Sequence, residues 1–230
     1  MTPLTLRNNG NTCWWNSLQQ CLYSCDIITK DTKFTIPFNK KRQECAHEAL
    51  YKIIDTYNLE HLFEMITLYT LKCEECGFTR TQKSKNIDIN IMPNNTIENY
   101  NMSENEICKG VMCEKQNKHT CHIKFNEVTK TNKFMVWTSQ MFALNTRWSM
   151  KPCEAYEIHG ENEDTKIYNL VGCILHFGGN RGGHYIAIIY DKTDDCWYYC
   201  NDSNVKKIDD NKFDQYITSK NLYMCFYKAI

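Results

Sequence analysis

The sequence predicts an α+β fold, in which helices form the front of the chain and an antiparallel sheet forms the back. Apolar residues recur at helical spacing near the start, at Trp14, Leu18 and Cys21. From Tyr168 onward the pattern changes to short β-rich runs that are separated by glycine or aspartate clusters. With 230 residues, 42% of them hydrophobic, the chain can bury one proper core. We therefore expect a single domain over residues 1–230.

The first helix is expected to begin near Cys13. An apolar stripe at helical spacing follows this residue, and Asn11 and Thr12 before it are suitable N-cap residues. Cys13 would then lie in the first turn, where unpaired N–H groups and the helix dipole lower the pKa of a thiol. The resulting thiolate is what a cysteine nucleophile needs. The alternative is that Cys13 is a buried small hydrophobe, the usual role of a free cysteine.

The segment from Ala46 to Leu68 carries a second helical stripe, after a polar stretch without a clear period. The middle of the chain, Thr70 to Trp137, is rich in polar residues and in cysteines. Within it, Cys73 and Cys76 have the C-x-x-C spacing of a zinc knuckle, which needs a second pair of ligands to complete a tetrahedron.

The strand-like runs at the back of the chain begin at Tyr168, and Phe134–Phe142 before them also has strand character. The runs from Tyr168 onward are broken by the glycines of residues 178–183 and by the polar residues 191–195. The expected strands are Asn169–Leu175, Tyr185–Tyr190, Cys196–Cys200 and Leu222–Tyr227.

Charge and cysteine usage limit the classes of function. Lysine plus arginine equal aspartate plus glutamate at 27 each, so no bulk charge favours a nucleic-acid or anionic-membrane partner. No stretch approaches the roughly 18 apolar residues of a membrane span, and residues 1–11 lack the apolar core of a signal peptide. Several of the fourteen cysteines lie inside apolar runs, as expected of reduced thiols. We therefore expect a monomeric protein of the reducing cytoplasm or nucleus that is not secreted.

Two long motifs resemble those of the ubiquitin-specific proteases. The segment from Asn8 to Leu22, N-N-G-N-T-C-W-W-N-S-L-Q-Q-C-L, is similar to the cysteine box of that family. The segment from Tyr168 to Ala187, Y-N-L-V-G-C-I-L-H-F-G-G-N-R-G-G-H-Y-I-A, is similar to its histidine box. Weaker similarity covers Gln43–Leu50, Trp197–Val205 and Leu222–Tyr227, so the resemblance spans nearly the whole chain.

The resemblance implies a papain-like cysteine protease fold. Residues 1–69 would form an N-terminal helical thumb that carries the cysteine box. Residues 70–137 would form reduced fingers of zinc-ribbon type, and residues 138–230 an antiparallel-sheet palm that carries the histidine box.

The resemblance also assigns catalytic roles. Cys13 would be the nucleophile and His184 the general base, since an imidazole titrates near neutral pH; His176 is the competing histidine. Asn201 would orient the imidazole, with Asp202 as the alternative, although an Asn-Asp turn is the ordinary use of these residue types. Asn8 would donate to the oxyanion, unless it is simply a turn residue beside Gly10.

Substrate and metal contacts follow from the same motifs. The residues expected to contact substrate are Gln20, Gln43, Gly183 and Tyr185.

The resemblance implies a structural zinc and no cofactor for catalysis. The tentative zinc ligands are Cys73, Cys76, Cys113 and Cys121. Gln116 stands where the second C-x-x-C would end and is a poor zinc ligand, so Cys108, His119, Cys121 and His122 all remain candidates for the fourth position, and four ordinary thiols remain the alternative.

The predicted function is hydrolysis of the isopeptide, peptide or thioester bond after the C-terminal glycine of ubiquitin through a thioester on Cys13. Its partners would be conjugates of ubiquitin or of a ubiquitin-like protein. One alternative is a protease for another ubiquitin-like modifier, because Cys45 occupies a position where the family carries an acidic residue. The other is a binding module without catalysis that keeps the fold and captures ubiquitin.

Overall fold

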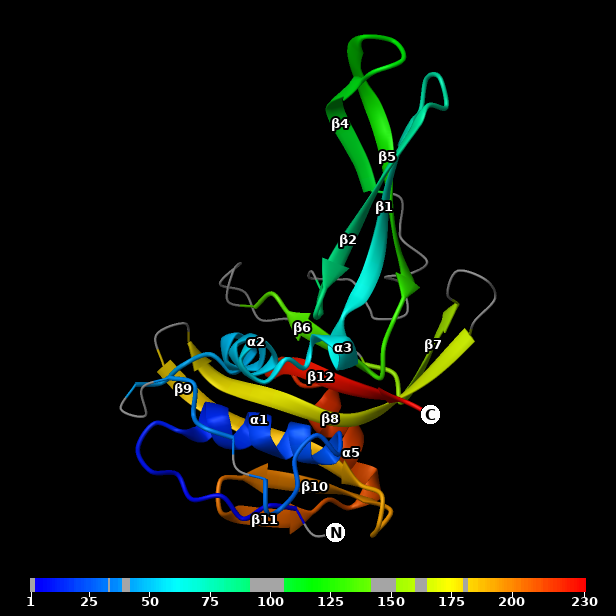
Figure 1. The fold of residues 1–230 in the computed structure, drawn as a ribbon. Coiled ribbons are helices and arrows are strands. Elements are labelled where there is room, and N and C mark those ends of the chain that lie inside the picture. Colours follow the sequence, from blue (N-terminus) through cyan, green and yellow to red (C-terminus); the bar gives the residue numbers. More distant parts are fainter. Residues whose placement is uncertain are drawn as a thin grey trace.

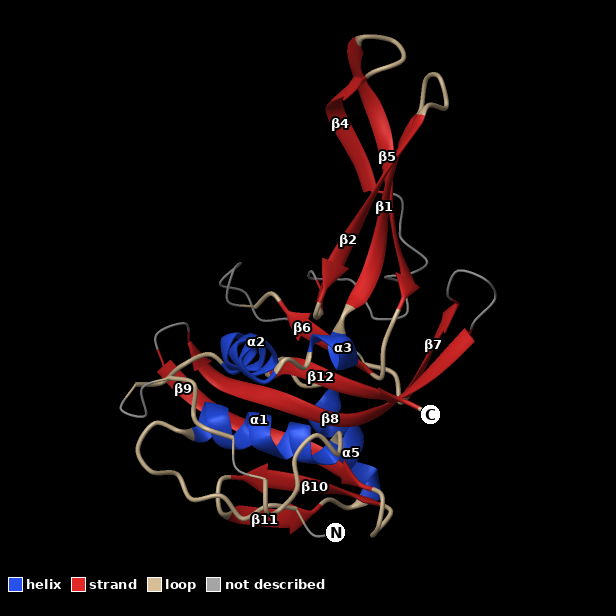
Figure 2. Ribbon diagram, in the orientation of Figure 1, coloured by secondary structure: helices blue, strands red, loops and turns tan. Residues whose placement is uncertain are grey.

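The computed structural model describes residues 3–32, 34–38, 42–91, 106–141, 152–159, 165–179 and 182–230. Most of these residues belong to two β-sheets, one of eight strands and one of four. Figure 1 shows the helices gathered around the larger sheet, while the smaller sheet projects away from it. Figure 2 shows that strands outweigh helices in the described part of the chain, so the predicted α+β fold is mostly β-structure.

The larger sheet, here called the large sheet, has the strand order β11-β10-β9-β8-β12-β6-β3, and β7 also pairs with β8. All its pairs are antiparallel except β3 with β6. The four predicted strand runs are confirmed as parts of β8, β9, β10 and β12. The strands are β3 (Ile89–Ile91), β6 (Phe134–Ser139), β7 (Ala155–His159), β8 (Thr165–Gly179), β9 (Gly182–Asp191), β10 (Cys196–Asn201), β11 (Asn204–Lys207) and β12 (Leu222–Ala229).

Both faces of the central strands of the large sheet are buried. On one face lie α1 (Cys13–Ser24) and α2 (Ala46–Tyr57), and the apolar stripe of α1 packs against β8 and β9 (Figure 1). On the other face lies α5 (Asp210–Ile217), whose Phe213 stacks on Trp197 of β10 and belongs with Ile217 to the second core cluster. Burial on two faces explains why these strands read as continuous apolar runs and could be predicted.

The second helical stripe ends earlier than predicted. α2 stops at Tyr57 because Asn58 adopts a left-handed conformation, with φ of 53°, that closes the helix. The short helix α3 (Glu60–Phe63) follows, and β1 (Met65–Cys73) then begins with alternating burial. The helical prediction for residues 65–68 is therefore wrong, and residues 1–69, assigned to the helical thumb, end in a strand.

The four-stranded sheet, here called the projecting sheet, has the order β2-β1-β5-β4 and is antiparallel throughout. Beside β1 it contains β2 (Thr79–Asn86), β4 (Glu106–Cys113) and β5 (Lys118–Lys130). Almost every residue of β2 is exposed, so its sequence has no apolar alternation from which a strand could be predicted. The exposed polar surface of β2 sets the projecting sheet apart from the large sheet.

None of the helices in the described ranges combines the length and the apolar character that crossing a membrane would require.

Candidate active site and thiol-imidazole cluster

Cys13 is the first residue of α1 and is 4% exposed. The backbone N–H groups of Tyr185, Trp14 and Cys13 surround its thiol and favour the thiolate. Burial has the larger effect and, together with the charge of Asp202, raises the pKa of Cys13 above its ordinary value. The expectation of a lowered pKa at the helix start is thus wrong, because desolvation outweighs the helix terminus.

His184 lies on β9 and is bonded to Asn201, the last residue of the neighbouring strand β10. The distance from His184 Nε2 to Asn201 Oδ1 is 2.7 Å. Since an amide oxygen only accepts, Nε2 carries the proton and Nδ1 is the basic nitrogen. Tyr185, which follows His184, contributes its backbone N–H to the Cys13 thiol, so the nucleophile and the imidazole lie beside the same strand.

The side chain of Asp202 has different hydrogen-bond partners from that of Asn201. Its carboxylate accepts from Asn8 Nδ2 at 3.0 Å and from Asn16 Nδ2 at 2.7 Å. The amide oxygen of Asn8, on the other side of the same amide group, accepts from the backbone N–H of Thr12 at 3.1 Å. Both ends of the Asn8 amide group are therefore fixed beside the start of α1.

Asn16 is a site residue that the sequence analysis did not single out. It is 5% exposed and joins Asp202 to the second turn of α1. The only available signal was its place within the cysteine box, three residues after Cys13. His176, the competing histidine, is 1% exposed and packs its ring on that of Tyr185 at 4.4 Å.

The four residues predicted to contact substrate lie in different settings. Gln20 is 2% exposed and binds both backbone groups of Leu4, at 3.2 and 2.5 Å. Gln43 accepts from the backbone N–H of Gly183 at 2.8 Å, which joins the segment before α2 to β9. The side chain of Tyr185 is 3% exposed. Contact with substrate stays a prediction for all four.

Gly183 is needed for packing inside the protein. A Cβ at this position would lie 2.2 Å from Phe177 O and 2.6 Å from His176 Nε2. The backbone that the glycine allows to approach is that of β8, so Gly183 sets the distance between the two strands that carry His176 and His184.

Near the far end of the projecting sheet lies a group of three cysteines and one histidine, here called the thiol-imidazole cluster. Its members are Cys73, Cys76, Cys113 and His122. Ligand atoms of Cys73, Cys113 and His122 all lie within 4.8 Å of one another, and these three residues are buried. Cys76 Sγ lies 3.6 Å from Cys113 Sγ, close to the ~3.8 Å edge of a tetrahedron with zinc–sulfur bonds of about 2.3 Å. A hydrogen bond from Thr120 is the main cause that lowers the pKa of Cys73 to about 6, which favours a metal-binding thiolate.

Cys121, one of the tentative ligands, is not in this group. It neighbours His122 on β5, and adjacent residues of a strand point to opposite faces. Gln116, in the turn after Cys113, keeps a buried Oε1 that has no partner within the described part of the chain. Among the described residues, Cys73, Cys113 and His122, with the adjoining Cys76, thus offer donor atoms that suit zinc, and Cys121 lies outside this group.

Comparison with known proteins agrees with this architecture. The family model described as "Ubiquitin carboxyl-terminal hydrolase" matches residues 44–227, a range that holds His184 and Asn201 and begins after Cys13. The structure of a SAGA deubiquitinase module containing Ubp8, bound to ubiquitin aldehyde, superposes with a TM-score of 0.73 and 17% identity, over 100% of this chain and 70% of that one. This second likeness shows the fold alone.

Curated relatives are much longer than this chain. Ubiquitin carboxyl-terminal hydrolase 15 of Rattus norvegicus is 41% identical over 61 residues, which are 26% of this chain and 6% of the relative. Ubiquitin carboxyl-terminal hydrolase 4 of Pongo abelii is 29% identical over 127 residues, 50% of this chain and 13% of the relative. Because the family model matches well over half of the sequence, this chain belongs to the ubiquitin carboxyl-terminal hydrolase family.

Proposed function

We propose that the protein is a thiol-dependent deubiquitinase, which hydrolyses the bond after the C-terminal glycine of ubiquitin through a thioester on Cys13. One observation carries the proposal. The His184–Asn201 hydrogen bond lies on the two strands beside the start of α1, and the residue after His184 donates to the Cys13 thiol. A cysteine, a histidine and an orienting amide in this order are the parts of a Cys-His-Asn site.

The raised pKa of Cys13 makes the base essential. The thiol stays protonated near neutral pH until His184 Nδ1 removes its proton, while Asn201 holds the opposite ring nitrogen. The thiolate then attacks the glycine carbonyl, and the imidazolium returns the proton to the leaving amine. Water hydrolyses the thioester by the same proton transfers and releases the carboxylate.

Donors for the oxyanion surround the start of α1. The backbone N–H groups there and the second amide hydrogen of Asn8 would stabilise the negative oxygen of the tetrahedral intermediate, each worth about 3 kcal/mol. Because a carboxylate accepts and never donates, Asp202 forces the amides of Asn8 and Asn16 to turn their NH₂ groups toward it. Asp202 would thus act through Asn8 and would not contact the substrate.

Turnover of ubiquitin with a fluorogenic C-terminal amide tests the proposal. Wild type should release the fluorophore, and His184→Ala should lower kcat at least a hundredfold, because general base catalysis contributes about 10²–10⁴-fold. His176→Ala is the matched control for the competing histidine. Folded wild-type protein without turnover would favour the binding module.

A protease for another ubiquitin-like modifier is the second candidate, and the setting of Cys45 favours it. The thiol lies 3.0 Å from the hydroxyl oxygen of Tyr223, a residue that is 3% exposed. A neutral thiol cannot form the charge-assisted contact that a carboxylate makes with an arginine of the modifier tail. A panel of modifiers with the same fluorogenic amide separates the two, and Cys45→Asp should shift the preference toward ubiquitin.

We also propose that zinc stabilises the projecting sheet through Cys73, Cys76, Cys113 and His122. The metal would cross-link β1, the turn that follows β1, β4 and β5. It would stabilise the fold and take no part in the chemistry of Cys13.

The fourteen free thiols fit a protein of the reducing cytoplasm or nucleus, which we propose as its location.

A further inference from the structure

The start of β9 has an edge that no strand covers within the described part of the chain. β10 pairs with β9 only from Ala187 to Asp191, so residues 182–186 lie beyond the end of that pairing. Gly182 and Gly183 are exposed and have no side chains that could shield their main-chain groups. A strand edge of this kind offers its N–H and C=O groups to another extended chain.

The main-chain N–H groups of Gly183 and Tyr185 both point to this edge. Residues two apart on a strand direct their N–H groups to the same side. Tyr185 directs its N–H to the Cys13 thiol, and Gly183, two residues earlier, directs its own N–H to a side chain that comes from outside β8. Two residues of a strand span about 7 Å, so the N–H of Gly183 lies about that far from the N–H that faces the nucleophile.

The tail of a substrate would follow the same edge. An extended chain whose carbonyl carbon lies at Cys13 can run along β9 only toward Gly183, because β10 covers the edge from Ala187 onward. Carbonyl oxygens two residues apart in an extended chain are also about 7 Å apart. The carbonyl two residues before the attacked one would therefore reach the N–H of Gly183.

The side chain of Gln43 holds this N–H in the structure. Its Oε1 accepts from the N–H of Gly183 at 2.8 Å and would lie 3.7 Å from a Cβ at Gly182, so it lies against both glycines. The oxygen of a side-chain amide is the same kind of acceptor as the carbonyl oxygen of a peptide. Gln43 therefore makes the contact that a carbonyl of the tail would make.

The segment that carries Gln43 is anchored by other contacts. The backbone N–H of Ala46, the first residue of α2, donates to the hydroxyl of Tyr185. The thiol of Cys45 lies 3.0 Å from the hydroxyl oxygen of Tyr223. These contacts do not involve the amide of Gln43, so a rotation of its side chain can free the N–H of Gly183 without moving α2.

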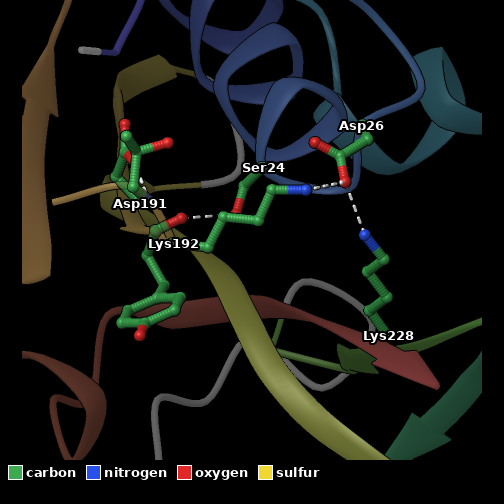
Figure 3. A network of polar contacts seen from close by, with 7 residues as sticks. Ser24, Asp26, Asp191, Lys192 and Lys228 are labelled. Carbon is green, nitrogen blue, oxygen red and sulfur yellow. Dashed lines mark hydrogen bonds and ion pairs between the residues drawn. The ribbon is translucent and has the colours of Figure 1, made fainter. Parts of the chain in front are cut away.

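The helix of the nucleophile is tied to the sheet at its other end. The hydroxyl of Ser24 lies 3.0 Å from the carbonyl oxygen of Tyr190 on β9 (Figure 3). Asp26, just after α1, binds the ammonium groups of Lys192 and Lys228 at 2.8 and 2.6 Å, as Figure 3 also shows. Because these bonds hold α1 in place relative to β9, the side chain of Gln43 is the part that can move aside.

We propose that Gln43 is an internal competitor of the substrate tail: its amide oxygen occupies the N–H of Gly183, and the tail binds only after this side chain has turned away. The inference rests on the proposed function, since it concerns the tail that would reach Cys13. One neutral hydrogen bond changes an equilibrium about two- to tenfold. The apparent affinity for the tail falls by the fraction of molecules in which the edge is free.

Two substitutions of Gln43 should have opposite effects on the binding of free ubiquitin, measured by calorimetry. Gln43→Met keeps the length of the side chain and removes the acceptor, so ubiquitin should bind about two- to tenfold more tightly than to wild type. Gln43→Glu keeps an acceptor and adds a charge, so ubiquitin should bind more weakly. Ubiquitin without its C-terminal tail should not discriminate between these proteins. Gln215→Met, an exposed change on α5, is the control and should have no effect.

Hydrogen exchange at the Gly183 amide, followed by NMR, tests the same contact without ubiquitin. Gln43→Met should accelerate this exchange by the factor by which it tightens ubiquitin binding, because both report how often the edge is free. Unchanged exchange or unchanged affinity in Gln43→Met would overturn the inference, and weaker binding would make Gln43 a substrate contact instead. Wild type that shows these changes without any turnover would contradict only the proposed hydrolysis.

Discussion

The large sheet and the projecting sheet are held together by different forces. The first six residues of β12 in the large sheet are all buried, while the first five residues of β2 in the projecting sheet are all exposed. Helices cover the large sheet on both faces, and apolar burial stabilises it. The projecting sheet has little core of its own, and its far end is joined by the thiol-imidazole cluster. A long polar sheet of this kind would gain stability from the zinc cross-link proposed above.

The largest effect should come from breaking that cross-link. His122→Ala removes one of four proposed ligands, and the protein should then purify with less than about 0.2 zinc per chain, since a structural site with three ligands binds far more weakly. Hydrogen exchange should accelerate in β1, β4 and β5 and stay unchanged in β8 and β9.

Cys121→Ser is the matched control for this change. It alters the adjacent residue on β5, which points to the other face, so zinc content and exchange should stay as in wild type. Zinc loss in Cys121→Ser with retention in His122→Ala would exchange the two residues in the ligand set. Metal-free wild type would mean that the cysteines only pack.

Equal truncations in the two sheets should have unequal costs. Leu18 of α1 is fully buried against the large sheet, and Leu18→Ala should lower the free energy of unfolding by about 2–5 kcal/mol. Leu71 of β1 is only partly buried, so Leu71→Ala should cost about 1 kcal/mol or less. Urea denaturation followed by tryptophan fluorescence measures both, and equal costs would contradict the contrast between the sheets.

Within the catalytic region, Asn201 and Asp202 should act on different steps. Asn201→Ala should lower kcat about tenfold or more, because the orientation of the base is worth on the order of 1.4 kcal/mol or above. Asp202→Ala should lower kcat less, because it acts through Asn8 and leaves the His184–Asn201 hydrogen bond in place. If Asp202→Ala is clearly the more damaging change, the roles must be exchanged.

A smaller effect should appear in the pH dependence of the reactivity of the Cys13 thiol. Burial and the charge of Asp202 raise the pKa of Cys13, so alkylation of Cys13 by iodoacetamide in a His184→Ala background should increase only above the pH at which an ordinary thiol ionises. Adding Asp202→Asn removes one of the raising charges, and the inflection should then move to lower pH. An inflection near pH 5–6 without the imidazole would mean that the helix terminus activates the thiol after all.

The central strands of the large sheet could be predicted from the sequence, because burial on both faces makes them apolar runs. The partly exposed strands β7 and β11 could not. The projecting sheet could not, since β2 is polar and its pairing with β1 leaves no periodic signal. Asn201 could be placed from its motif. The bonds from Asp202 to Asn8 and Asn16 could not, because they join residues 194 and 186 positions apart.

Two further outcomes depended on three-dimensional burial. The direction of the pKa shift at Cys13 follows from desolvation, which no local pattern reports. The grouping of His122, and not Cys121, with Cys73 and Cys113 depends on the face of β5 that each side chain occupies, which the sequence alone does not give.

The most direct measurement of the central claim is the reaction of the protein with ubiquitin that carries a C-terminal electrophile. We expect one adduct per chain, mapped by mass spectrometry to Cys13, and no adduct in Cys13→Ala. Cys21 and Cys25 lie on the same helix segment but are fully buried, and they serve as internal controls. An adduct that persists in Cys13→Ala, or that maps to either of these cysteines, would contradict the assignment of Cys13 as the nucleophile.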